Sequence, residues 1–346
     1  MARLTKLGDY RCGVCGGTDF LPIDFSSYVM PTESANPAIN DFVNHICDGC
    51  GVIAPYPAPD MTVLSEHYNS AYRKDAYDIE TPNGLLRLPI QIPWSGVSFL
   101  RFKSFFDAFE RNKARHPDIV PQATDAMIDF GAYQGMFLHA AVQAWGCSGV
   151  AYDFNETGIS FAKNALGMTE SQVAKDIYSD TFARKGRFAV LIHAFEHLQF
   201  PDRFLAHLHE KVLEPGGWLY IEVPNAFGFS LADPTHYFTY TTDSLRFLLE
   251  KSGFAVADIW IGNYPLLEDE PWSNPQQNIY ALCKADPGAA ANARPPVASA
   301  QEIYKRIRRT YRRLSFEYVM RQLRFVMHHA IRLPVHFWRF LRNDLL

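Results

Sequence analysis

The chain has 346 residues, 48% of them hydrophobic and 20% charged, a composition ordinary for a soluble globular protein of more than one domain. Residues 302–346 hold eleven Lys or Arg against three acidic residues, a balance of +8, so with a net charge of −4 the rest of the chain carries −12. An acidic body is a poor surface for nucleic acid, and no apolar run reaches the roughly 18 residues of a membrane-spanning helix.

The first 60 residues are rich in turns and contain two pairs of cysteines. In "CGVC" and "CDGC" the two-residue spacing lets both thiolates of a pair reach one ion from a single turn. Unmetallated thiols or a redox pair are alternatives, but so short a segment needs a metal to fold, and a redox CxxC should lie in a βαβ unit. We therefore predict a zinc-binding module over residues 1–60 with a closed, structural site. Its ligands are Cys12, Cys15, Cys47 and Cys50.

The next segment, residues 61–124, is predicted to be a helical transition region and lid. Residues 62–73 ("TVLSEHYNSAYR") and 98–112 ("SFLRFKSFFDAFERN") repeat their apolar residues at helical spacing. No stretch of signal-peptide length begins the chain, so we expect a cytoplasmic protein with reduced thiols.

From residue 125 to 285, apolar strands alternate with helical segments, the pattern of a parallel sheet covered on both faces. The predicted strands are 126–130, 149–153, 171–177, 187–193, 218–224, 254–261 and 277–285. The predicted helices are 135–146, 156–167, 202–213 and 242–253.

The remaining residues divide into a linker and a tail. Residues 286–301 consist largely of Ala, Pro and small polar residues, which predicts a flexible linker. Residues 302–346 form a basic amphipathic helical tail whose Phe, Trp and Arg suit a membrane interface. Packing on the acidic body is the alternative, and the sequence leaves both open.

A glycine-containing turn follows the first strand of the sheet, in "MIDFGAYQGMF". The strand ends at Asp129, and Gly131 and Gly135 bracket the turn before a helix, which places backbone N–H groups at the carboxyl edge of the sheet. The next strand ends at Asp153, about twenty residues on, where it would accept the ribose hydroxyls of an adenosine. Asp176 follows the third strand and would face the adenine amine.

The spacing of the two glycines distinguishes between cofactors. A dinucleotide site needs G-x-G-x-x-G so that the backbone approaches a pyrophosphate, whereas this turn is G-x-x-x-G with Tyr133 between the glycines. The spacing therefore favours a cofactor without phosphate, S-adenosylmethionine, over NAD.

Several motifs resemble those of the class I S-adenosylmethionine-dependent methyltransferases over about residues 125–284: "IDFGAYQG", "GVAYD", "AKDI", "HAFEHL", "VLEPGGWLYIEVPN" and "HYFTYTTDSLRFLLEKSGF". The resemblance implies a Rossmann-like α/β fold with a seven-stranded sheet whose last strand is antiparallel. The cysteine module is similar to the zinc module of bacterial sugar methyltransferases, which implies methyl transfer to a sugar or nucleotide sugar in a glycan pathway. The predicted cofactor site comprises Asp129, Gly131, Tyr133, Gly135, Asp153, Phe154, Asp176, Ile177 and His193.

The motif "HAFEHL" supplies acid–base groups just beyond the fourth strand. His197 is the first choice for a general base because an imidazole titrates near neutral pH, with Glu196 beside it. Alternatively, both residues brace the following helix. His236 in "DPTHYFTY" is a rival base, Tyr237 a wall of the pocket, and Asn225 a group that orients a substrate hydroxyl.

Two alternative hypotheses about the function stay open. A methyltransferase-like domain could act without catalysis, binding a ligand or protein through the zinc segment and the tail. An NAD-dependent enzyme is the third reading, which the glycine spacing disfavours.

Overall fold

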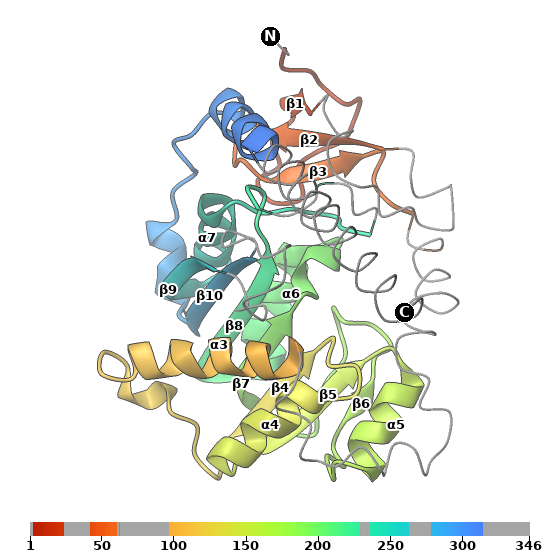
Figure 1. Ribbon diagram of the computed structural model, residues 1–346, viewed down its shortest axis with the longest axis vertical. Coiled ribbons are helices and arrows are strands. Elements are labelled where there is room, and N and C mark those ends of the chain that lie inside the picture. Colours follow the sequence, from red (N-terminus) through yellow and green to blue (C-terminus); the bar gives the residue numbers. More distant parts are fainter. Residues whose placement is uncertain are drawn as a thin grey trace, which may run out of the picture.

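The structure, a computed structural model, describes residues 3–23, 42–60, 62, 97–228, 231, 235–262 and 278–313. A small three-stranded sheet near the N-terminus lies at one end of a larger sheet flanked by helices (Figure 1). Of the helix predicted over 62–73, only Thr62 belongs to the described residues.

The N-terminal module consists of the antiparallel strands β1 (Phe20–Pro22), β2 (Val43–Cys47) and β3 (Ile53–Tyr56), in the order β1-β2-β3. The turn between β2 and β3 carries the second cysteine pair. Gly51 adopts φ 70° in this turn, a left-handed conformation that glycine tolerates without steric cost.

The large sheet has the order β6-β5-β4-β7-β8-β10-β9. Strands β4 to β8 pair in parallel, and β10 pairs antiparallel with both β8 and β9. The predicted seven-stranded methyltransferase-type sheet is therefore confirmed. The strand bounds are β4 (Ala126–Phe130), β5 (Ser148–Asp153), β6 (Gln172–Val173), β7 (Gly186–Ile192), β8 (Leu213–Pro224), β9 (Phe254–Gly262) and β10 (Asn278–Ala285).

Helices cover both faces of this sheet and build two cores. Helices α3 (Val97–Asn112), α4 (Met136–Trp145) and α5 (Glu156–Asn164) contribute to one core. The other face is covered by α6 (Pro201–His207), the following π-helical turn η5 (Leu208–Val212) and α7 (Thr242–Lys251). The short 3-10 turns are η3 (Pro117–Ile119), η4 (Phe195–His197) and η6 (Pro287–Asn292).

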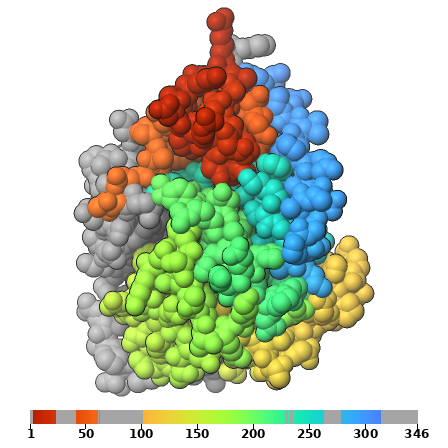
Figure 2. Space-filling view, turned by 180° about the vertical axis from the view of Figure 1, so that it is seen from behind, coloured from red at the N-terminus to blue at the C-terminus, as the bar shows by residue number. Residues whose placement is uncertain are grey.

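The segment after the large sheet returns to the N-terminal module. The stretch expected as a linker contains η6, and Ala289 and Ala300 are buried. A helix over 300–313 follows, and its Ile303 and Ile307 join the core cluster of the N-terminal module. The two chain segments lie together at one end of the molecule (Figure 2).

The described part of the basic tail thus packs against the body of the protein. Ala300 donates its backbone N–H to Asp48 Oδ1 at 3.0 Å, and the Tyr311 hydroxyl accepts from the N–H of Leu231 at 3.0 Å. Residues 314–346 lie outside the described residues. Among the helices that the structure describes, none has the length and apolar character needed to cross a membrane.

Candidate active site

The parallel strands bring the predicted site residues to one edge of the large sheet. After β4 the chain adds β5 and β6 on one side, and it then crosses to add β7 and β8 on the other. The loops after β4 and β7 therefore meet at a topological switch point, where open α/β sheets bind ligands. They meet closely, because a Cβ added to Gly131 would lie 2.9 Å from the Ala194 Cβ.

The turn after β4 uses most of its own N–H groups internally. Gly131 donates to the Tyr152 carbonyl at 2.9 Å, and Tyr133 donates to Asp153 Oδ2 at 2.8 Å. Gly135 donates to the Ala132 carbonyl at 2.8 Å, so these three donors are not available to a pyrophosphate. Gly131, Tyr133 and Gly135 all have positive φ, at 77°, 50° and 71°.

Asp153 is held rigidly at the end of β5. Its Oδ2 accepts from the Tyr133 N–H and its Oδ1 from the Asn155 N–H, each at 2.8 Å. An ionised carboxylate has about four lone-pair positions, so it can accept from several donors at once. Phe154, beside it, is a large apolar side chain that is 50% exposed, which makes it a surface on which an aromatic ring could stack.

Asp129 lies in β4 and is buried. Burial, with the negative charge of Asp153 adding to it, raises its pKa well above the ordinary value, while Arg101 acts in the opposite direction. A cationic group placed beside this carboxyl would favour its ionised form.

Asp176 lies beyond the end of β6 and is exposed. Its Oδ2 accepts from the Ser179 hydroxyl at 2.6 Å and its Oδ1 from the Tyr178 N–H at 3.0 Å. The hydrogen bond from Ser179 is the main reason why the pKa of Asp176 is lowered. Ile177 is half-buried and packs against the core, so the two residues differ in how accessible they are to a ligand.

A histidine between two buried glutamates follows β7. His193 Nε2 lies 3.0 Å from Glu222 Oε1, and Nδ1 lies 3.3 Å from Glu196 Oε1. Burial disfavours the charged imidazole, but these two carboxylates raise the pKa of His193 to about 9. Burial likewise disfavours ionised Glu196, but the hydrogen bond to His193 and nearby imidazoles lower its pKa to about 2.

The backbone at this position is strained. His193 has φ 51°, and the only other non-glycine residue with positive φ among those described is Tyr133, in the loop on the neighbouring strand. Such conformations cost of order 1–3 kcal/mol each and cluster at functional sites. Both strained residues lie at the switch point of the sheet.

Two further histidines complete what we call the Glu–His–His cluster, namely Glu196, His197 and His236. One ligand-type atom from each lies within 4.8 Å of the others. His197 Nδ1 is 3.0 Å from the Thr235 carbonyl, and its Nε2 is 3.9 Å from Glu196 Oε1. A carbonyl only accepts, so Nδ1 carries a proton, and in the neutral imidazole the lone pair is then on Nε2.

Asn225 and Tyr237 have architectural contacts in the structure. Asn225 is fully buried, and its Oδ1 accepts from the Phe227 N–H at 3.2 Å. The Tyr237 hydroxyl donates to the Pro59 carbonyl at 3.0 Å, joining the N-terminal module to the segment that covers Glu196. A direct role with a substrate stays a prediction for both.

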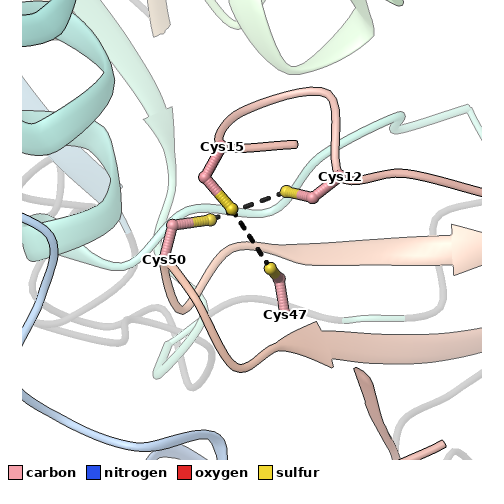
Figure 3. Close-up of side chains that lie close together, drawn as sticks. All are labelled: Cys12, Cys15, Cys47 and Cys50. Atoms are coloured by element: carbon pink, nitrogen blue, oxygen red, sulfur yellow. Dashed lines mark hydrogen bonds between the residues drawn. The ribbon is translucent and has the colours of Figure 1, made fainter. Parts of the chain in front are cut away.

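The four predicted zinc ligands converge, and we call them the four-cysteine cluster (Figure 3). The Sγ atoms of Cys12 and Cys50 are 3.6 Å apart, and those of Cys15 and Cys47 are 3.5 Å apart. Backbone N–H groups of two residues in the first cysteine turn donate to sulfurs of this cluster; they belong to Val14 and Gly17.

Hydrogen bonds within the four-cysteine cluster act on the pKa values of its thiols. Hydrogen bonds among the sulfurs lower the pKa of Cys15 and Cys47 and raise that of Cys12 and Cys50. A tetrahedron of sulfurs about 2.3 Å from a zinc ion has edges of about 3.8 Å, so this donor set fits the ion.

The sequence analysis missed two members of the network around His193. Glu222 is fully buried in β8, and its Oε1 also accepts from the Asn278 side chain at 3.0 Å. A single acid inside the apolar run "WLYIEVP" was a usable signal, because a buried charge needs a partner. Asn278 had no comparable signal.

Comparison with known families now adds to this geometry. Residues 100–259 match the model of a family described as a methyltransferase domain. The prediction of a methyltransferase, made from the motifs, is thereby confirmed. No curated protein matches the chain.

Solved structures similar to this chain include three methyltransferases described as S-adenosylmethionine-dependent. One from Clostridium acetobutylicum is 10% identical, with 56% of this chain and 94% of that chain covered and a TM-score of 0.42. One from Mesorhizobium loti is 14% identical, with 50% and 97% covered and a TM-score of 0.40. One from Methanosarcina mazei is 19% identical, with 48% and 94% covered and a TM-score of 0.36.

Proposed function

We propose that the protein uses S-adenosylmethionine to methylate a small polar acceptor, a sugar or nucleotide sugar in a bacterial glycan pathway. The observation that carries this proposal is the meeting of the β4 and β7 loops within the methyltransferase domain. There, the turn that carries the proposed cofactor site packs against Ala194, two residues before Glu196 of the Glu–His–His cluster.

The cofactor proposal rests on the turn after β4. The backbone N–H groups of Gly131, Tyr133 and Gly135 donate to acceptors within the protein, so the turn suits a ligand without phosphate. Asp153 would accept the ribose hydroxyls, with Phe154 and Ile177 beside the adenine and Asp176 facing its amine. Asp129 and His193 would complete the cofactor site on either side of the switch point.

The catalytic proposal rests on His197. The bound cofactor supplies an activated methyl group, so the protein must orient the acceptor and remove its proton. His197 Nε2 would take the proton that the acceptor loses as it is methylated. Glu196 then stabilises the imidazolium, and His236 is the alternative base.

Two other residues would border the acceptor. Tyr237 would form a wall of the acceptor pocket, and Asn225 would orient a hydroxyl group of the acceptor. The hydrogen bonds of these two side chains help to fix the loops that carry them. The sugar class itself is supported by the likeness of the cysteine module to those of bacterial sugar methyltransferases.

The four-cysteine cluster would hold a structural zinc ion. Four cysteines leave no open coordination position, so the ion stabilises the module and takes no part in methyl transfer. Reduced thiols suit a cytoplasmic protein, and a peripheral contact with the inner face of the membrane would fall to the basic residues beyond 313.

Calorimetric titration with S-adenosylhomocysteine tests the proposed cofactor. We expect micromolar binding by the wild type, a loss of at least tenfold in affinity for Asp153→Asn, and no binding of NAD. Asp202→Asn, at an exposed carboxylate in the first turn of α6, is the matched control. Folded, zinc-loaded protein that does not bind the ligand would refute the enzyme proposal and favour a non-catalytic binding module.

A further inference from the structure

The Glu–His–His cluster has an unexplained buried oxygen. The Glu196 side chain is 1% exposed, and its Oε2 has no hydrogen-bond partner among the residues that the structure describes. Leaving a buried charged acceptor unsatisfied is costly. A bound cation would satisfy it.

The geometry points to a binding site for one divalent transition-metal ion, formed by Glu196, His197 and His236 and separate from the four-cysteine cluster. The three donor atoms lie within 4.8 Å of one another and come from η4 and from the segment after β8. Two imidazoles and one carboxylate form a donor set that binds first-row transition ions and leaves open positions.

The surroundings of the three donors match those of metal ligands. A ligating histidine characteristically donates its second N–H to a carbonyl or carboxylate, which fixes its tautomer, and His197 does so to the Thr235 carbonyl. His193 hydrogen-bonds Glu196 Oε1 at 3.3 Å and would orient the carboxylate from behind. The His197 side chain is 23% exposed, so one side of the site is open to a ligand.

The distances need only a small adjustment on binding. Donor atoms about 2.1 Å from one ion are separated by roughly 3.0–3.5 Å. His197 Nε2 and Glu196 Oε1 are now 3.9 Å apart, and the rings of His197 and His236 have centroids 4.8 Å apart. Closing this gap involves side chains of η4 and of the segment after β8, outside the sheet itself.

The two kinds of donor predict which ions bind. Two nitrogen ligands disfavour Mg²⁺ and Ca²⁺, which prefer oxygen, and the lack of thiolate distinguishes the site from the four-cysteine cluster. The consequence for catalysis rests on the proposed function. With an ion bound, the Nε2 lone pair of His197 is engaged, so the ion would replace the free imidazole in activating the acceptor, by acidifying an acceptor hydroxyl bound at its open position.

Titration of zinc-loaded protein with Co²⁺ tests the site, because cobalt bound by nitrogen and oxygen absorbs in the visible range without thiolate-to-cobalt charge transfer. We expect one equivalent to bind saturably. Affinity should fall at least about tenfold in His236→Ala and in Glu196→Gln, which preserves the shape of the buried side chain. His116→Gln, outside the cluster, is the matched control and should bind like the wild type.

Three results would overturn the proposal. The first is that Co²⁺ produces no visible absorption, and the second is that His236→Ala binds Co²⁺ as tightly as the wild type. The third is the appearance of thiolate-to-cobalt charge-transfer bands with release of zinc, which would show that cobalt is bound by the cysteines. Zinc content and thermal unfolding of each variant show that it is folded. Calorimetry with S-adenosylhomocysteine on the same samples tests the proposed function separately. The proposed cofactor site depends on Asp153, which is not part of the Glu–His–His cluster.

Discussion

The four-cysteine cluster and the Glu–His–His cluster differ in almost every property that determines what a site can do. The four cysteines are chemically identical donors on two turns, with N–H groups of Val14 and Gly17 already directed at the sulfurs. The Glu–His–His cluster mixes an acid with two imidazoles and follows a residue with a strained backbone, and its buried Glu196 Oε2 has no partner within the described part of the chain. A closed, uniform donor set indicates a structural role, whereas an open and strained one indicates a reactive site.

A short segment joins the two clusters. Thr239 exchanges two backbone hydrogen bonds with Ile53 of β3, at 2.8 and 3.0 Å, and the Glu196 carbonyl accepts from the Tyr237 N–H at 2.9 Å. The Phe238 ring lies over Gly13, where an added Cβ would meet it at 2.8 Å. Residues 235–241 therefore contact the N-terminal module on one side and the candidate catalytic groups on the other, which couples the stability of the module to the geometry of those groups.

The largest effect is expected when a ligand is removed from the four-cysteine cluster. Replacing Cys50 by Ser should release zinc and destabilise the protein by several kcal/mol, since metal binding is part of the folding free energy of such a module. Methyl transfer should fall as well because residues 235–241 lose their support. Zinc content and thermal unfolding are the measurements, and Cys147→Ala, at a cysteine outside the cluster, is the control. A Cys50→Ser variant that unfolds like the wild type would show that the module needs no ion.

A substitution in the Glu–His–His cluster should affect activity much more than stability. His197→Gln removes the proposed base, and we expect kcat/KM to fall by about 10²–10⁴-fold while affinity for S-adenosylhomocysteine stays within about twofold. Steady-state kinetics and calorimetry on the same sample separate the two effects. The simple bracing role for His197 predicts the reverse, a large loss of stability with modest loss of activity per folded molecule.

Local signals explain why much of the large sheet was predictable. The stretch "AMIDF" matches β4 residue for residue, and Gly146 ends α4 as predicted, with φ 69°. Each depends on neighbouring residues alone. The convergence of the four cysteines was also predictable, because the CxxC spacing fixes the local turn and zinc chemistry requires the two turns to meet.

Contacts between distant parts of the chain were not predictable from pattern. The sequence predicts a strand over 171–177, but only Gln172 and Val173 pair with β5. The chain then turns, and Asp180 accepts hydrogen bonds from the backbone N–H groups of Lys175 and Asp176. Similarly, the helix over 300–313 is amphipathic in either environment, and only its tertiary partners show that it packs on the module. Nothing in the sequence near Asn278 indicated its bond to Glu222.

The contact between the loops after β4 and β7 can be tested with two glycines that share a backbone conformation. Gly131→Ala and Gly146→Ala both place a side chain at φ near 70°, which costs about 1–2 kcal/mol. The Cβ at Gly131 would also press on Ala194 at 2.9 Å, whereas Gly146 has open space around it. We expect Gly131→Ala to lose about 1 kcal/mol more in urea unfolding and to bind S-adenosylhomocysteine more weakly. Equal effects of the two substitutions would mean that the loops do not rely on this contact.

The last effect concerns the charge state of Asp129 at the same edge of the sheet. Because burial raises its pKa in the folded protein, the folded state binds more protons than the unfolded state above about pH 4, the ordinary range for Asp. The contribution of Asp129 to the free energy of unfolding therefore falls as pH rises, by at most about 1.4 kcal/mol per pH unit, until the raised pKa is passed.

Asp129→Asn cannot ionise, so its stability should decline less steeply with rising pH than that of the wild type. Urea unfolding at several pH values checks the difference, with Asp202→Asn, at an exposed carboxylate, as the matched control. Parallel curves for the wild type and Asp129→Asn would mean that Asp129 is already ionised in the folded protein without the cofactor. The attraction of Arg101 would then outweigh the combined effect of burial and the charge of Asp153.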